Sequence, residues 1–277
     1  MYDKNNIKKV LSIAGSDCSG GAGIQADLKT FSSHGVYGMA VITSVVAENT
    51  FRVTDYQDVR PDIIEKQIDD IFEDIMPDAV KIGMLSCREI MLSVAKKIKK
   101  WKPNNVVVDP VMYAKNGASL MKESDINALI SVILPLADLV TPNIPEAEKI
   151  SGIKIKTFHD MKRSARLIYK SGCRAVVVKG GHDEGNDAID ILFDGNEFYE
   201  YCAPRISTKH THGTGCTFSS SVAANVALGF PLIKALERTK KYISTAIANA
   251  IEIGKGHGPI HHFYEMYKKF FSERNDD

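Results

Sequence analysis

The sequence has few cysteines and no long apolar run. Its five cysteines are widely spaced and odd in number, and no pair follows the Cys-x-x-Cys pattern. Neither a disulfide framework nor a zinc cluster is therefore predicted, and a reducing, cytoplasmic compartment is expected. No stretch approaches the roughly 20 apolar residues that cross a bilayer. The polar start from Met1 to Lys9 does not have the pattern of a signal peptide.

The chain also lacks an excess of charge of either sign. Lys and Arg number 35 and Asp and Glu number 34, so the net charge is +1. This balance gives no electrostatic footprint for nucleic acid or an anionic membrane, and neither is an expected partner. A hydrophobic share of 44% is typical of a globular protein and excludes a disordered or collagenous chain. Because no linker or repeat divides residues 1–277, we expect one domain with a polar tail from about residue 272.

Apolar, β-branched runs alternate with amphipathic segments along the chain. Strands are predicted at Val10–Ala14, Met39–Val46, Ala79–Ile82, Val106–Asp109, Leu139–Thr141 and Ala175–Lys179, with a hairpin over Ala188–Phe193 and Glu197–Cys202. Helices are predicted at Ile24–His34, Asp62–Asp74, Ile90–Lys100, Ile126–Leu134, Met161–Ser171, Thr217–Leu228, Pro231–Ile253 and around Pro259–Phe271. This alternation predicts an α/β fold with a mainly parallel sheet. Ligands of such sheets bind beyond the carboxyl ends of the strands.

Two glycine-rich segments follow predicted strands. Gly15–Gly23 leads into a helix, and its glycines let backbone approach a ligand closely. A flexible turn with a helix cap explains the same pattern equally well. His212–Thr217 opens a long apolar helix, where unpaired N–H groups at the positive end of the helix dipole form a ready anion site. Cys216 is expected in the first turn with a lowered thiol pKa, the alternative being a small buried cysteine behind a tight turn.

Charged residues stand at the ends of three further strands. Lys179, before Gly180-Gly181, is placed either to meet a phosphate or simply to be solvated. Asp109 and Glu146 fit a sparse magnesium site of two carboxylates, water and phosphate oxygens. Asn143 and Glu146 fit a helix capping box as well. The P-loop, H-E-x-x-H and G-x-S-x-G motifs are absent. Together these features suit phosphoryl transfer without a P-loop, which relies on positioning and charge neutralisation.

Seven segments carry a resemblance to a known family. They are Ala14–Thr30, Lys81–Leu85, Asp109–Met112, Thr141–Ala147, Lys179–His182, Thr211–Thr217 and Gly256–His262. In these segments the sequence resembles the hydroxymethylpyrimidine kinase / phosphomethylpyrimidine kinase family of thiamine biosynthesis, within the ribokinase-like superfamily. The resemblance implies a ribokinase-like three-layer α/β/α sandwich. It also implies an ATP- and magnesium-dependent enzyme that phosphorylates 4-amino-5-hydroxymethyl-2-methylpyrimidine to the monophosphate and then to the diphosphate, and it suggests a homodimer.

The resemblance further implies a role for each site residue. Substrate contacts fall on Gly15, Ala22, Asp27, Glu48, Met84 and Val111. ATP contacts fall on Lys179, Asn143, Thr211, Gly213 and Gly215. Asp109 and Glu146 would hold magnesium, and Gly213, Thr214, Gly215 and Cys216 would form the anion hole.

Two positions invite a hypothesis of their own. Cys216 stands where most superfamily relatives carry an aspartate base, and a largely protonated thiol would not repel the monophosphate in the second step. Glu48 stands where the family commonly shows glutamine. An ionised glutamate only accepts hydrogen bonds. It would accept one from the 4-amino group of the pyrimidine and a second if the adjacent ring nitrogen is protonated, so we expect the pyrimidine to bind more weakly as pH rises. The nearest alternative activity is a pyridoxal (vitamin B6) kinase, and a more distant one is a non-catalytic metabolite-binding protein on a kinase fold.

Overall fold

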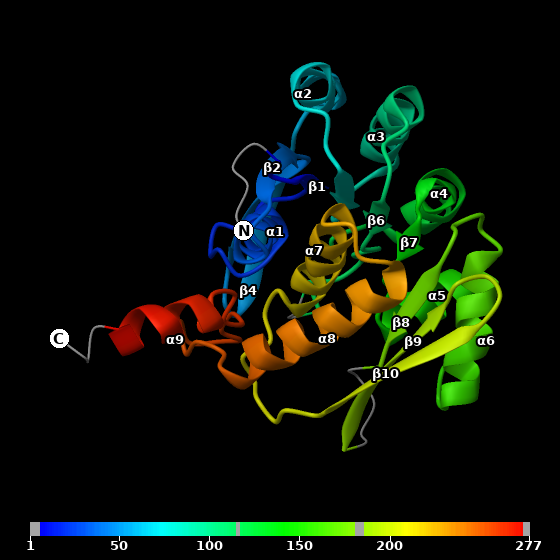
Figure 1. Ribbon diagram of the computed structural model, residues 1–277. Helices are drawn as coiled ribbons and strands as arrows, with labels where there is room; N and C mark the ends of the chain where they lie inside the picture. Colours follow the sequence, from blue (N-terminus) through cyan, green and yellow to red (C-terminus); the bar gives the residue numbers. More distant parts are fainter. Residues whose placement is uncertain (1–5, 115–116, 181–185, 274–277) are drawn as a thin grey trace.

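An eight-stranded sheet forms the centre of the molecule in the computed structural model, which describes residues 6–114, 117–180 and 186–273 (Figure 1). The strands run in the order β10-β9-β8-β7-β6-β5-β1-β2. They are β1 (Lys9–Ala14), β2 (Tyr37–Ile42), β5 (Ala79–Ile82), β6 (Val106–Val108), β7 (Leu139–Val140), β8 (Val176–Lys179), β9 (Asp187–Phe193) and β10 (Phe198–Pro204). The six strands from β8 to β2 are parallel, and β9 and β10 form the predicted hairpin at one edge. The predicted mainly parallel α/β sheet is confirmed.

Helices cover both faces of the sheet, as expected for a three-layer sandwich. On one face lie α1 (Gly23–Ser33), α7 (Thr214–Ala227) and α8 (Leu232–Ala248). The other face carries α2 (Pro61–Asp74), α3 (Arg88–Trp101), α4 (Ile126–Ala128), α5 (Ile144–Ser151) and α6 (Phe158–Tyr169). Side chains alternate between the two faces along each strand, so Leu11 and Ile13 of β1 enter one apolar layer and Val10 enters the other.

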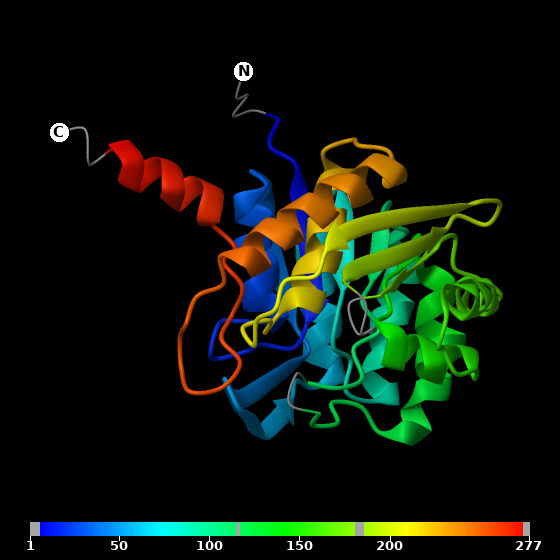
Figure 2. The ribbon, with the colours of Figure 1, turned by 90° about the horizontal axis from the view of Figure 1, so that it is seen from below.

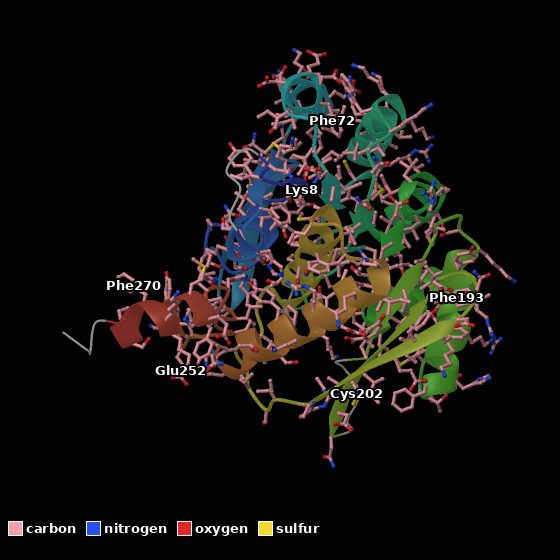
Figure 3. The ribbon with its side chains drawn as sticks, viewed as in Figure 1. Lys8, Phe72, Phe193, Cys202, Glu252 and Phe270 are labelled. Atoms are coloured by element: carbon pink, nitrogen blue, oxygen red, sulfur yellow. The ribbon has the colours of Figure 1, made fainter. Side chains whose placement is uncertain are left out.

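The last helix, α9 (Tyr264–Glu273), projects away from the sandwich (Figures 1 and 2). Phe72 of α2 and Phe193 of β9 are buried in the apolar layers, whereas Phe270 of α9 is 52% exposed (Figure 3). In the described part of the chain, no helix is long and apolar enough to cross a membrane.

The predicted strand Met39–Val46 is wrong in its extent. The structure ends β2 at Ile42 and begins β3 (Ser44–Asn49), which pairs with β4 (Arg52–Asp58) in a separate two-stranded sheet. Thr43 fixes the break, because its N–H donates to the Ala14 carbonyl at 3.0 Å and its hydroxyl donates to the Met84 carbonyl at 2.9 Å. The small sheet leaves the main one and stands over the carboxyl ends of its strands, where β3 contributes cavity-lining residues.

Three predicted helices also differ from the observed ones. Residues 126–136 form short turns of changing pitch rather than one helix, and Pro135 interrupts their backbone hydrogen bonding because it has no N–H. The helix predicted over Pro231–Ile253 ends at Ala248, and the last helix begins at Tyr264 rather than Pro259. Residues 249–263 between them pack on the β3–β4 turn, with the His257 N–H donating to the Thr50 carbonyl at 2.7 Å.

Candidate active site

A cavity of about 600 Å³ opens at the carboxyl ends of the parallel strands, where the sequence predicts the site. It brings together every predicted site residue except Asp27. Those that line it are Gly15, Ala22, Glu48, Met84, Asp109, Val111, Asn143, Glu146, Lys179, Thr211, Gly213, Thr214, Gly215 and Cys216. They come from segments as far apart in the chain as Gly15 and Cys216, so one concave surface unites motifs that are individually weak in the sequence.

The two glycine-rich loops touch at the start of α7. Gly213 precedes the helix with a φ of 78°, a conformation that favours glycine. A Cβ added to Gly213 would lie 1.7 Å from the Gly21 carbonyl oxygen, so the approach of the loops requires glycine there. No side chain caps α7, and its first turn lies beside the cavity at the positive end of the helix dipole, with the Thr214 N–H donating to the Thr211 carbonyl at 3.3 Å. This geometry is the one expected of an anion site.

Asp17 holds the first glycine loop in shape. Its side chain is buried and accepts hydrogen bonds from the N–H groups of Ser19, Gly21 and Ala22 at 2.7, 2.9 and 2.7 Å. The His212 ring of the second loop adds a contact of 2.9 Å. Burial alone would raise the pKa of Asp17, but the hydrogen bonds from His212, Ser19 and Ala22 hold it well below the usual range. The loop predicted as either turn or ligand site is therefore a rigid, charged structure.

Cys216 lies in the first turn of α7 as predicted, but its predicted low pKa is wrong. Burial raises the pKa of the thiol to about 12, and the negative charges of Asp27 and Asp109 add to this rise. The Lys81 ammonium and the Gly23 amide favour the thiolate and reduce the effect only in part. The outcome agrees with the alternative of a small cysteine behind a tight turn, because the loss of water outweighs the effect of the helix end. The thiol is thus protonated at neutral pH, the form that the two-step hypothesis for Cys216 requires.

Lys179 is part-buried and ion-paired, which excludes the alternative of a solvated lysine. Its ammonium lies 3.2 Å from Oδ1 of Asp109, and the side chains are only 13% and 3% exposed. Asp109 is held further by the hydroxyls of Thr141 at 3.3 Å and Ser219 at 3.4 Å. Burial works against the charge of Lys179, but Asp109 and Glu146 raise its pKa above the usual value. A permanent positive charge therefore faces the cavity beside Gly215. The next residues of the motif, Gly181 and His182, lie outside the described residues.

Glu146 forms the predicted capping box at the start of α5. The Asn143 N–H donates to Oε2 of Glu146 at 2.9 Å, and the Glu146 N–H donates to Oδ1 of Asn143 at 3.0 Å. The same carboxylate lines the cavity, so the capping and ligand interpretations are compatible. Burial and the charge of Asp109 raise the pKa of Glu146 to about 7 against the opposing charge of Lys179. The negative charges of Asp109 and Glu146 repel each other in one cavity, and a cation bound between them would relieve this repulsion.

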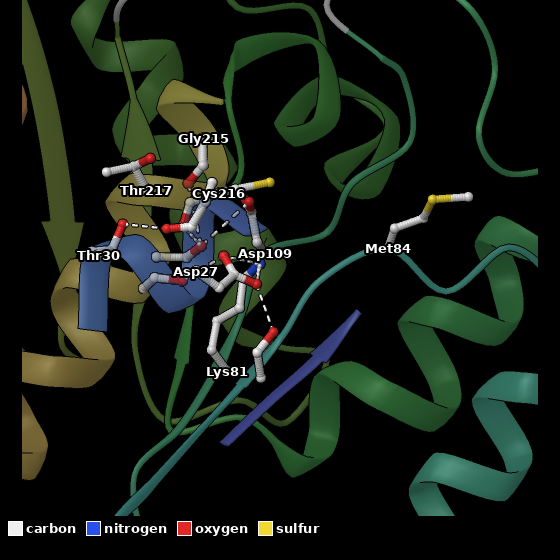
Figure 4. A network of polar contacts seen from close by, with 12 residues as sticks. Asp27, Thr30, Lys81, Met84, Asp109, Gly215, Cys216 and Thr217 are labelled. Carbon is white, nitrogen blue, oxygen red and sulfur yellow. Dashed lines mark hydrogen bonds and ion pairs between the residues drawn. The ribbon is translucent and has the colours of Figure 1, made fainter. Parts of the chain in front are cut away.

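Asp27 is the predicted substrate residue that the structure places behind the cavity wall. Figure 4 shows Asp27 of α1 facing Lys81 of β5, next to Asp109 and Cys216. The Lys81 ammonium contacts both Asp27 oxygens, at 3.0 and 2.8 Å, and neither side chain is exposed. Hydroxyls of Ser12 and Ser220 each donate to Asp27 at 2.6 Å. Both oxygens are therefore fully occupied, and it is Lys81 that reaches the cavity.

Sequence reasoning missed the far half of the cavity. Its apolar wall comes from β10, the segment after it, and α8, through Ala203, Pro204, Ile206, Ile243 and Ile247. At its base Lys240 pairs with Asp190 at 2.7 Å, and Asp190 accepts the Gly180 N–H at 3.0 Å. These elements have the alternation of small and apolar residues found in any core-facing segment. The sequence pattern therefore does not distinguish cavity-lining residues from core residues.

Comparisons with known proteins agree with this geometry. A family model described as phosphomethylpyrimidine kinase matches residues 17–261. A hydroxymethylpyrimidine/phosphomethylpyrimidine kinase of Bacillus subtilis is 45% identical over 93% of this chain and 96% of its own length. A thiamine biosynthesis bifunctional protein of Geobacter sulfurreducens is 47% identical over 91% of this chain, which spans 52% of that relative.

Solved structures of two kinds superpose on the chain. A phosphomethylpyrimidine kinase from Clostridium difficile has a TM-score of 0.78 at 48% identity and covers 87% of this chain and 99% of its own. An ADP complex of Bacillus subtilis pyridoxal kinase has a TM-score of 0.88 at 38% identity and covers 94% of this chain and 99% of its own.

Fold and site together define a ribokinase-like kinase, a phosphotransferase that uses ATP. Within that class, the match over most of the sequence shows that the chain belongs to the phosphomethylpyrimidine kinase family. The alternative of a non-catalytic binding protein finds no support among these relatives.

Proposed function

We propose that the protein transfers phosphoryl groups from ATP first to the hydroxymethyl group of 4-amino-5-hydroxymethyl-2-methylpyrimidine and then to the resulting monophosphate. The observation that carries the proposal is the convergence of Lys179, Asp109 and Cys216 on one cavity beside the uncapped start of α7. Such a site positions two anionic groups and neutralises their charge, which is most of what phosphoryl transfer requires. The family membership selects the substrate.

The amides of Gly213 to Cys216 and the Lys179 ammonium would bind the ATP phosphates. In the first step the substrate hydroxyl oxygen attacks the γ-phosphorus, the bond from that phosphorus to the β-phosphate bridge breaks, and ADP leaves. The thiol first releases its own proton to solvent, and the hydroxyl proton then passes to the Cys216 sulfur, so that the small thiolate fraction acts as the base. In the second step the nucleophile is a phosphate oxygen that is already ionised, and no base is required. A neutral thiol does not repel the negatively charged monophosphate in this step, whereas an aspartate at the same position would.

Magnesium would be held by Asp109 and Glu146. Two carboxylates with the remaining positions left to phosphate oxygens and water are a donor set that this ion favours, and both line the cavity. Bound there, magnesium would neutralise charge on the transferred phosphoryl group. Lys179 bridges the same region, since the charges of both Asp109 and Glu146 act on it.

The apolar half of the cavity would hold the adenine ring. Ile243 and Ile247 of α8 and Ala203 and Pro204 of β10 line the same cavity as Lys179 and Gly215. Transfer of an aromatic ring from water to such an apolar wall is favourable in free energy. Asn143 and Thr211, which also line the cavity, would contact the nucleotide as the resemblance implies.

Pyridoxal phosphorylation is a second candidate activity. The structural likeness to a pyridoxal kinase, with a TM-score of 0.88, is the observation that favours it. A parallel assay separates the two. The purified protein with magnesium and ATP is given either the hydroxymethylpyrimidine or pyridoxal, and the products are weighed by mass spectrometry. Monophosphate followed by diphosphate from the pyrimidine supports the first function, and pyridoxal phosphate alone supports the second.

A cytoplasmic location and a homodimeric assembly stay predictions. Cell fractionation tests the first, and light scattering coupled to size-exclusion chromatography tests the second.

A further inference from the structure

Glu48 belongs to a compact cluster of titratable side chains at the edge of the cavity. It lies on β3 and lines the cavity together with Val46 and Met84. One carboxyl oxygen of Glu48, one of Asp17 and a ring nitrogen of His212 all lie within 4.8 Å of one another. Asp17 and His212 come from the two glycine loops, so three separate segments meet at this point.

Asp17 keeps its negative charge in this cluster. It is 1% exposed and accepts three backbone N–H groups besides its contact with His212. Protonation of Asp17 is unfavourable, because it would place a hydrogen-bond donor on a carboxyl group that already accepts from these N–H groups. A fixed charge therefore stands next to Glu48, and two adjacent carboxylates in an apolar cavity disfavour double ionisation.

The groups that face the Glu48 carboxyl in the described residues are few. Asp17 and His212 approach it across the cavity edge, and its partner on β4 is the uncharged Val53. The Cys18 thiol donates to the Glu48 backbone carbonyl at 3.0 Å rather than to the carboxyl group. Burial and then the charge of Asp17 raise the pKa of Glu48 to about 7, a side-chain hydrogen bond with Asp17 adds to this rise before the substrate binds, and His212 opposes it only in part.

We propose that Glu48 meets the substrate ring as a neutral carboxylic acid, kept in that form by ionised Asp17, and so selects rings that carry an amino group next to an unprotonated nitrogen. A neutral acid donates through its hydroxyl and accepts through its carbonyl, as a glutamine amide does. An aminopyrimidine edge offers the matching acceptor and donor, and two hydrogen bonds form. Pyridoxal has no amino group beside its ring nitrogen. The inference rests on the proposed function and deepens it.

This assignment replaces the expectation, drawn from the sequence, of an ionised Glu48. An ionised glutamate would need a protonated ring to make a second hydrogen bond. The two arrangements contain the same number of protons and respond to pH in the same direction. They differ in whether the proton sits on Glu48 or on the ring.

The ultraviolet spectrum of the bound pyrimidine locates that proton, because ring protonation changes its absorption. The pyrimidine is titrated into the full-length protein without ATP between pH 7 and 9, with Glu48→Gln as the test variant and Asp55→Asn as a control that removes an exposed carboxylate from β4. We expect the spectrum of the unprotonated ring. The affinity of the wild type and of Asp55→Asn should fall by about tenfold per pH unit once Glu48 ionises, and the affinity of Glu48→Gln should stay constant.

Three results would overturn the inference. They are the spectrum of a protonated ring, an affinity of the wild type that does not vary with pH, and an affinity of Glu48→Gln that falls in parallel with the wild type. A failure of the proposed function looks different. It gives a protein that phosphorylates pyridoxal and neither binds nor phosphorylates the pyrimidine, and it overturns the inference with it.

Discussion

The Lys81 ammonium lies 2.8 Å from Oδ2 of Asp27 at a point where both side chains are completely buried. The pair sits in the apolar layer between the sheet and helices α1 and α7, with Ser12 and Ser220 completing the hydrogen bonds of Asp27. Burial lowers the pKa of Lys81, but the charges of Asp27 and Asp109 keep it above the usual value. Lys81 therefore stays charged and presents a fixed cation to the floor of the cavity.

Removing Lys81 should destabilise the fold. In Lys81→Met, the Asp27 carboxylate is left buried and unpaired, and breaking such a pair costs about 3–5 kcal/mol. Urea unfolding monitored by circular dichroism measures this loss. The double variant Lys81→Met, Asp27→Asn should recover part of it, because no unpaired charge remains. If Lys81→Met were as stable as the wild type, Lys81 would not be needed to neutralise the buried charge of Asp27.

Cys216→Ala should slow the first phosphorylation far more than the second. Loss of a general base lowers a rate by about 10²–10⁴-fold, and only the first step has a proton to remove. Quench-flow with mass detection, started from the pyrimidine or from its monophosphate, measures the two steps separately. Cys202→Ser is the control, since that cysteine is exposed on β10. Equal losses in both steps would contradict the hypothesis.

The Cys216 thiol should remain protonated over the working pH range. Burial raises its pKa to about 12, so the thiolate becomes the main form only above that pH. Thiolate absorbance, measured as the difference between wild type and Cys216→Ala during a pH titration, reports this directly. A difference signal that is already complete at pH 7 would refute both the raised pKa and the two-step argument.

Gly213→Ala should abolish most activity, whereas Gly229→Ala should not. Both glycines have a positive φ, of 78° and 89°, so both variants carry a backbone strain of about 1–2 kcal/mol. Only Gly213 abuts backbone, since a Cβ there would lie 1.7 Å from the Gly21 oxygen and nothing lies within 4 Å at Gly229. Separating the loops displaces the α7 amides, and such misplacement costs about 10²-fold in kcat/KM. Similar activities for the two variants would disprove the role of the loop contact.

Lys179→Met should lower kcat by about 10²–10³-fold, the range seen when one stabilising donor is removed from an anion hole. The affinity for ATP should fall as well, because the ammonium faces the phosphate end of the cavity. Steady-state kinetics with varied ATP measures both effects. An unchanged kcat would contradict the assignment of Lys179 to the phosphate site.

The strand ends were predictable because apolar β-branched runs stop there at a charged residue or a glycine. Asp109, Glu146 and Lys179 were found by this rule, and all three line the cavity. The break at Thr43 was not predictable, since the apolar pattern continues from β2 into β3 while Val45 turns outward and Val46 turns inward. β4 has no buried residue and so no periodicity to detect.

The electrostatics of the site depend on contacts that a sequence does not contain. Asp27 was taken for a substrate ligand, but Lys81 lies 54 positions away in the chain and occupies both of its oxygens. The raised pKa of Cys216 likewise follows from burial and from the neighbouring carboxylates, which outweigh its place at a helix start.

The product assay tests the central claim most directly. Purified protein is incubated with magnesium, ATP and 4-amino-5-hydroxymethyl-2-methylpyrimidine, and a parallel sample contains pyridoxal. Mass spectrometry follows the products over time. The account predicts that the pyrimidine monophosphate accumulates first and is then converted to the diphosphate. Pyridoxal phosphate as the sole product, with the pyrimidine untouched, would contradict it.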